Sequence, residues 1–158
     1  MKTIIFYATK NGATREIAQR IAKKMEGAVL HDLKQDKMPS LADFDRIIIG
    51  SSVYVGMIRK EAKAFLAQNA EQLQGKRLGL FLSGLQGGEE KVFFDTNFPA
   101  AVLKTAKVAM FLGGIFDPKK AGVMGRLVMK VVAKKAEYID CIDDKKIGKF
   151  VEILSDGK

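Results

Sequence analysis

Small polar residues and glycines follow several apolar segments of this sequence, at the points where those segments end. The first group is TKNGAT, residues 9–14, which leads directly into a segment of helical periodicity. Hydroxyl groups, a glycine and the free N–H groups of a helix N-terminus together bind anions, and the helix dipole favours negative charge there. The sequence lacks the GxxxxGK[ST] and GxGxxG patterns of two other phosphate-binding loops. Residues 9–14 are therefore predicted to form a phosphate loop of a different kind.

Asn11 and Gly12 also have the composition of a hairpin turn. A hairpin requires an alternating strand after the turn, whereas residues 13–25 place apolar side chains at spacings of three and four, as amphipathic helices do. We therefore favour the phosphate loop over a hairpin and over a plain strand-to-helix turn.

The elements that must position this loop can be predicted from hydrophobic periodicity. Four continuous apolar runs have the composition of strands buried on both faces: residues 3–8, 46–50, 78–83 and 108–114. A weaker strand is predicted at residues 28–33, suited to the edge of a sheet. Helical spacing covers residues 13–25, 60–73 and 144–154, the last with Asp143 or Asp144 as N-cap, and a shorter helix lies within residues 95–105.

This alternation of strands and helices predicts an α/β fold with a doubly wound sheet in one domain. Ligands bind such sheets at the carboxyl ends of the strands. Two further loops stand at these ends, GSSVYVG at residues 50–56 and SGLQGG at residues 83–88. The candidate site therefore combines three loops.

TKNGAT resembles the TxTGxT phosphate loop of flavodoxins, and the other two loops follow the strands after which that family covers the two faces of a flavin. The resemblance implies a single flavodoxin-like domain over residues 1–158, with a five-stranded parallel sheet of order 2-1-3-4-5 and a basic helical insertion before the last helix. It implies FMN as the cofactor.

The resemblance also implies roles for individual residues. Thr9, Asn11 and Thr14 would bond the phosphate through their side chains, helped by backbone N–H groups of residues 10–14. Tyr54 either stacks on the flavin or packs under its loop, and Gly56 lies near flavin N5. The implied cofactor-binding residues are Thr9, Lys10, Asn11, Gly12, Ala13, Thr14, Ser51, Ser52, Val53, Tyr54, Val55, Gly56, Ser83, Gly84, Leu85, Gln86 and Gly87.

Two features depart from the flavodoxin pattern. Asn11 stands where the family usually has Thr, and the chain contains no Trp, the frequent stacking residue. No catalytic side chain and no metal ligand is predicted.

The segments KNGATREIA and GSSVYVG resemble the flavodoxin-like, menaquinone-dependent protoporphyrinogen oxidases more than the electron-carrier flavodoxins, which are typically acidic. This resemblance implies an FMN-dependent oxidoreductase of heme biosynthesis that passes electrons to a quinone. The alternative is a flavodoxin-type carrier that exchanges electrons with a redox-partner protein and has no small-molecule substrate of its own.

The net charge of +9 is concentrated in one segment. Residues 118–136, called here the basic segment, hold six basic and no acidic residues, leaving 21 bases against 18 acids elsewhere. If this segment is helical, its basic residues form a stripe on one side and its apolar residues form a face on the other. Such a helix suits an anionic membrane surface, a porphyrinogen or packing on the sheet edge. A local charge of this kind argues against nucleic-acid binding. The six basic residues are Lys119, Lys120, Arg126, Lys130, Lys134 and Lys135.

Other features bound the environment of the chain. The single cysteine, Cys141, allows no intrachain disulfide, and no apolar run approaches the roughly 18 residues that span a bilayer. We expect a cytoplasmic protein, with peripheral contact to the inner face of the cell membrane left open. His31 is predicted to lie at the surface, and Cys141, Phe93 and Phe94 to be packing residues.

Overall fold

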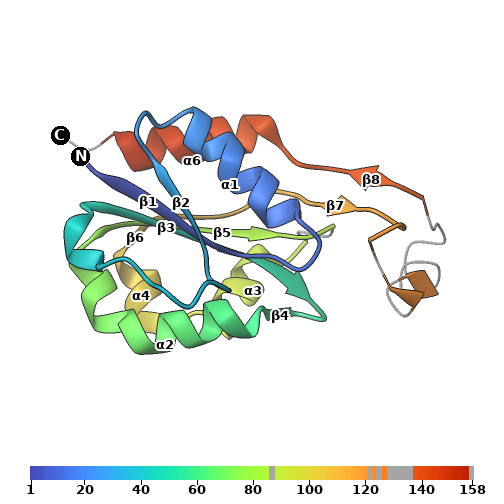
Figure 1. Ribbon diagram of the computed structural model, residues 1–158, viewed down its shortest axis with the longest axis horizontal. Helices are drawn as coiled ribbons and strands as arrows, with labels where there is room; N and C mark the ends of the chain where they lie inside the picture. The colour runs from blue at the N-terminus through green and yellow to red at the C-terminus, as the bar shows by residue number, and fades with distance from the viewer. Residues whose placement is uncertain (86–87, 121, 124–125, 128–136, 157–158) are drawn as a thin grey trace.

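Five parallel strands and one short antiparallel strand, β4 (Met57–Ile58), form the central sheet of this protein (Figure 1). The computed structural model describes residues 1–85, 88–120, 122–123, 126–127 and 137–156. The sheet order is β2-β1-β3-β5-β6. Since β5 and β6 are the fourth and fifth predicted strands, the predicted order is confirmed. The parallel strands are β1 (Thr3–Ala8), β2 (Val29–Asp32), β3 (Arg46–Tyr54), β5 (Arg77–Ser83) and β6 (Ala106–Phe111).

Helices cover both faces of the sheet, so its central strands are buried on both sides (Figure 1). One face packs against α1 (Ala13–Lys23) and α6 (Asp144–Ser155), through Ile5, Ile48 and Phe81 of the strands. The other face packs against helices that follow β4 and β5. These are α2 (Lys60–Gln74), α3 (Glu90–Asn97) and α4 (Ala100–Thr105), and a short 3₁₀ helix, η1 (Leu41–Asp43), precedes β3.

The predicted helix within residues 95–105 is two helices in the structure. Pro99 separates α3 from α4, and Phe98 before it has extended backbone angles (φ −113°, ψ 142°). A residue that precedes proline is driven out of the helical region by contact with the proline ring. The final helix agrees with its prediction, since the Asp143 side chain accepts hydrogen bonds from the Lys145 and Lys146 N–H groups.

The basic segment begins next to a small two-stranded sheet that the sequence did not predict. β7 (Ile115–Phe116) pairs antiparallel with β8 (Ile139–Asp140), which leads into α6. Between them, Arg126 N–H donates to the Gly122 carbonyl at 3.0 Å, a helical hydrogen bond. Val123 and Leu127 are 67% and 52% exposed, so these two apolar side chains do not pack on the sheet edge. Lys130, Lys134 and Lys135 lie outside the described residues.

The edge position predicted for residues 28–33 is confirmed, because β2 pairs with β1 alone. His31 on this strand is only partly at the surface. Its ring lies edge-on to Phe6, with 5.5 Å between centroids, and among the described residues its buried Nε2 has no hydrogen-bond partner. Burial lowers the pKa of His31, and the nearby Asp32 carboxylate opposes this shift.

The lowered pKa of His31 predicts a loss of folding stability in acid. The unfolded chain takes up a proton near pH 6.5, while the folded chain resists it to lower pH, so acidification favours unfolding. We expect urea midpoints of the wild type to fall between pH 7.5 and 5.5 more than those of His31→Gln. Equal pH dependence in the two proteins would contradict this assignment.

Candidate functional site

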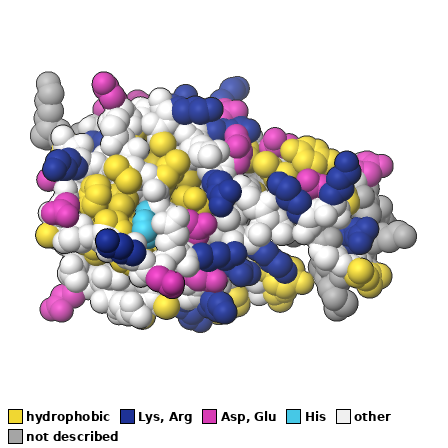
Figure 2. All heavy atoms as spheres, in the orientation of Figure 1, with side chains coloured by type: hydrophobic (Ala, Val, Ile, Leu, Met, Phe, Trp, Pro, Cys, Tyr) yellow, Lys and Arg dark blue, Asp and Glu magenta, His cyan; other side chains and the backbone are white. Residues whose placement is uncertain are grey.

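The carboxyl ends of the parallel strands β1, β3 and β5 lie at the same end of the sheet, so the three predicted loops meet there (Figure 1). Each loop contacts at least one of the others through atoms described below. Lys and Arg side chains gather over this end of the molecule, around the start of α1 and beside β7 (Figure 2).

The first loop leaves the N-terminus of α1 open. Gly12 precedes the helix with a left-handed φ of 98°, and no side chain caps the helix. Thr9 Oγ1 instead accepts the Gly12 N–H at 2.9 Å, which holds the loop in shape. The N–H groups of Ala13 and Thr14 stand in the first turn, where a helix offers no partner of its own. These donors, with the helix dipole, suit an anion.

Thr14 joins the first loop to the third. Its Oγ1 lies 2.7 Å from Ser83 Oγ, and both residues are completely buried. In a pair of hydroxyls one donates and the other keeps its own hydrogen for a further acceptor. The Thr14 hydroxyl is therefore an internal link, and its predicted bond to a phosphate stays a prediction.

The second loop differs in form from the one expected. β3 continues to Tyr54 and turns back through Val55 (φ 50°) and Gly56 (φ 73°) into β4 (Met57–Ile58), which pairs antiparallel with it. Positive φ at both central residues matches the right-handed twist of a two-residue hairpin. β-Branched residues such as Val55 rarely adopt this conformation, which explains why a hairpin could not be predicted at this position.

Residues of the second loop divide into supporting and exposed groups. The buried Ser51 hydroxyl donates to the Ser52 carbonyl and accepts the Arg59 N–H, both at 3.0 Å, so it supports the hairpin. Val53 packs against the core. Tyr54 is 53% exposed, and Lys10 Nζ of the first loop lies 5.6 Å from its ring centroid. A ring this exposed does not pack under the loop.

Asn97 is a supporting residue that the sequence did not reveal. Its buried side chain accepts the Ile58 N–H at 3.0 Å and donates to the Gly56 and Phe93 carbonyls at 2.8 Å. These bonds fasten the hairpin to the end of α3. An asparagine at the end of a predicted helix gives no signal of a partner so distant in sequence.

The third loop packs closely against the segment after β6. Gly84 N–H donates to the Gly113 carbonyl at 3.0 Å, and a Cβ on Gly114 would lie 2.8 Å from the Gly84 oxygen. A Cβ on Gly84 would lie 3.8 Å from the Val53 carbonyl, which places the second and third loops together. Leu85 is half-buried, and Gln86 and Gly87 lie outside the described residues. Cys141, predicted to pack, is exposed.

Two solved flavodoxin structures share this fold. Oxidised Flavodoxin 1 from Bacillus cereus is 17% identical to this chain and superposes with a TM-score of 0.64. The superposition covers 100% of this chain and 99% of that one. Oxidised Flavodoxin 2 from Bacillus cereus is 22% identical, with a TM-score of 0.63 and 98% of both chains covered.

A curated relative, protoporphyrinogen IX dehydrogenase [quinone] from Escherichia coli strain K12, is 30% identical over 77 residues. The match covers 46% of this chain and 42% of the relative, so less than half of the relative is spanned. A family model described as Flavodoxin domain matches residues 4–140, which is most of the chain and includes all three loops. This protein belongs to the flavodoxin domain family.

Proposed function

We propose that this protein binds FMN at the three loops and works as an FMN-dependent oxidoreductase, similar to quinone-dependent protoporphyrinogen IX dehydrogenase. The observation that carries the proposal is the open N-terminus of α1 in a flavodoxin domain, linked by the Thr14 and Ser83 hydroxyls to the third loop of the same site.

The donor set of the first loop fits a phosphate monoester. A phosphate presents several acceptor oxygens and no donor, and the first turn of α1 presents N–H groups without a capping side chain. Thr9 is occupied by the Gly12 N–H, whereas Asn11 is exposed and free to turn toward a ligand. The Gly12 N–H is already bonded to Thr9, so the other backbone N–H groups of residues 10–14, the Asn11 side chain and the hydroxyl of Thr14, when it accepts from Ser83, would hold the phosphate.

The other two loops fit a flat aromatic ring. Tyr54 offers an exposed ring on the hairpin, and the third loop lies beside that hairpin, with the Cβ position of Gly84 3.8 Å from the Val53 carbonyl. A bound flavin supplies the redox chemistry in such proteins, and the chain supplies binding, orientation and electrostatics. The site residues named here would bind and orient the ring, and none is assigned a proton transfer.

By analogy with the name of the partly matching Escherichia coli enzyme, we propose a porphyrinogen as electron donor and a quinone as acceptor. In the described part of the basic segment, Lys119, Lys120 and Arg126 are exposed and could meet an anionic substrate or membrane surface. No helix among the described residues is long and apolar enough to cross a bilayer.

A flavodoxin-type carrier is the second candidate. Its support is the apolar surface of the hairpin, where Val55 is 81% and Met57 42% exposed beside Tyr54. Exposed apolar residues at a cofactor site suit the docking of a redox-partner protein.

Two assays test these functions in turn. The purified protein should absorb as a flavoprotein, and denaturation should release FMN, identified by chromatography against riboflavin and FAD. Protoporphyrinogen oxidation with menaquinone would support the enzyme, whereas rapid electron exchange with a flavodoxin reductase alone would support the carrier. A colourless protein that does not take up FMN would overturn both.

A further inference from the structure

Lys120 of the basic segment lies beside the first loop, far from it in sequence. Its Nζ stands 3.9 Å from the point that a Cβ on Gly12 would occupy, and no other described atom outside the neighbouring residues lies within 4 Å of that point. An ammonium group therefore stands at the open N-terminus of α1, where the N–H groups of the first turn also gather.

A tight turn holds Lys120 in this place. Lys119 N–H donates to Asp117 Oδ1 at 2.9 Å and Lys120 N–H to the Asp117 carbonyl at 3.1 Å. Aspartate first and proline second, as in Asp117 and Pro118, is the composition that a type I turn favours. The turn directly follows β7, so the backbone that carries Lys120 is anchored by the β7 and β8 pair.

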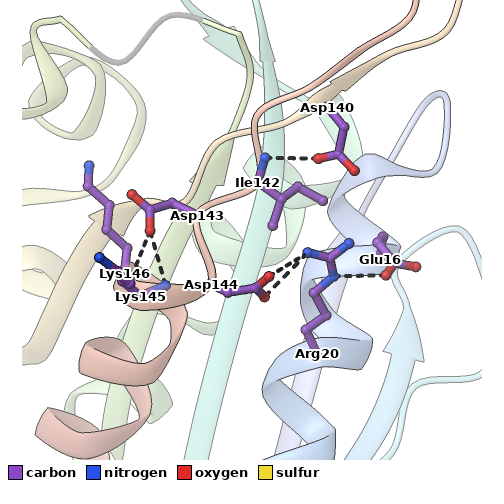
Figure 3. A network of polar contacts seen from close by, with 8 residues as sticks. All are labelled: Glu16, Arg20, Asp140, Ile142, Asp143, Asp144, Lys145 and Lys146. Carbon is purple, nitrogen blue, oxygen red and sulfur yellow. Dashed lines mark hydrogen bonds and ion pairs between the residues drawn. The ribbon is translucent and has the colours of Figure 1, made fainter.

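The base of this pair is fixed to the helix that carries the first loop. Beyond β8, α6 begins with Asp144, which accepts from Arg20 of α1 at 3.2 Å, while Arg20 also donates to Glu16 at 2.9 Å (Figure 3). Figure 3 shows Arg20 reaching across from α1 to the start of α6. The basic segment and the first loop are therefore both attached to the contacting pair α1 and α6.

The charges around this point favour an anion. Lys120 Nζ lies beside Gly12, at the positive end of the α1 dipole, and in the described part of the chain neither Lys120 nor Lys10 of the first loop has a carboxylate within 4.0 Å. Arg15 differs, since it pairs with Asp32 at 3.6 Å. A cation at the positive end of a helix dipole is destabilising until a counter-charge arrives.

We infer that Lys120 bonds the phosphate of bound FMN, so that the basic segment contributes a cation to the phosphate loop. This inference rests on the proposed FMN site and assigns one of its residues. It separates Lys120 from the other basic residues of the segment and gives it a role in cofactor affinity. An ammonium donor to a phosphate acts as a point charge, so its contribution is sensitive to salt.

The test compares Lys120→Gln with Lys119→Gln, which removes the same charge from the same turn. Flavin-free protein is titrated with FMN and with riboflavin, and binding is followed by quenching of flavin fluorescence. Lys120→Gln should weaken FMN binding about tenfold, the size expected when a charge-assisted hydrogen bond is lost, and leave riboflavin binding unchanged. Raising salt should weaken FMN binding by the wild type more than by this variant.

The outcomes separate the two claims. FMN binding by the wild type, with Lys120→Gln and Lys119→Gln equally tight, would overturn the role of Lys120 and leave the FMN site standing. Equal losses of FMN affinity in both variants would also overturn it, since a general charge effect would then suffice. Failure of the wild type to bind FMN would overturn the proposed function together with this inference.

Discussion

Gly113→Ala is expected to lower the free energy of unfolding by about 3 kcal/mol or more. Placing a residue with a Cβ in the left-handed region costs about 1 to 2 kcal/mol, and overpacking costs about 1 to 3 kcal/mol. Gly113 has a φ of +84°, and its new Cβ would lie 1.9 Å from the Cys141 carbonyl oxygen. Its next nearest neighbours, the Cys141 carbonyl carbon and Ile142 Cα, are also backbone atoms and cannot easily move aside. Because Gly113 also accepts the Gly84 N–H, flavin binding should fall with stability. Urea unfolding and FMN titration measure the two effects.

Gly27→Ala is the matched control. Gly27 has a similar φ of +74°, but no described atom lies within 4 Å of its Cβ position. It should lose only about 1 to 2 kcal/mol, the cost of the backbone conformation, and keep its FMN affinity. If the two variants lose the same stability, the close packing of Gly113 against Cys141 is not what the fold depends on.

Thr14→Val is expected to weaken FMN binding roughly ten- to a hundredfold, as a hydrogen bond to a charged group contributes about 1.5 to 3 kcal/mol. The substitution keeps the volume of the side chain and removes its hydroxyl. It also leaves the completely buried Ser83 hydroxyl without its partner, so the free energy of unfolding should fall by about 1 to 3 kcal/mol.

Thr14→Ser keeps the hydroxyl and removes the methyl group instead, so it is the control for a change at this position that spares the hydroxyl. Ser83→Ala and the double variant complete a double-mutant cycle. The stability losses of the two single variants should add up to more than the loss in the double variant. Additive losses would show that the hydroxyl pair contributes nothing as a pair. Equal FMN affinity of Thr14→Val and Thr14→Ser would contradict a role of this hydroxyl in the cofactor site.

The sheet could be predicted because its central strands are buried on both faces. Such strands appear in the sequence as continuous apolar runs, and residues 3–8 and 78–83 match β1 and nearly all of β5. Resemblance to a known family supplied the strand order. The cap at Asp143 could also be predicted, because capping depends on residues two and three positions away.

The form of the second loop could not be predicted from local sequence. Val55 takes a conformation that usually belongs to Gly, Asn or Asp, and the hairpin is held there by Asn97 on a different element. The position of Lys120 depends in the same way on the packing of α6 against α1. Contacts between distant segments depend on the folded chain, and local periodicity carries no information about them.

The central claim is that the three loops form an FMN site, and a titration of flavin-free protein tests it most directly. FMN, riboflavin and FAD are added separately, and binding is followed by flavin fluorescence and by calorimetry. We predict one FMN bound per chain, about a hundredfold or more tighter than riboflavin, because several charge-assisted bonds would reach the phosphate in the proposed site. Equal affinity for FMN and riboflavin, or no binding of either, would contradict the account.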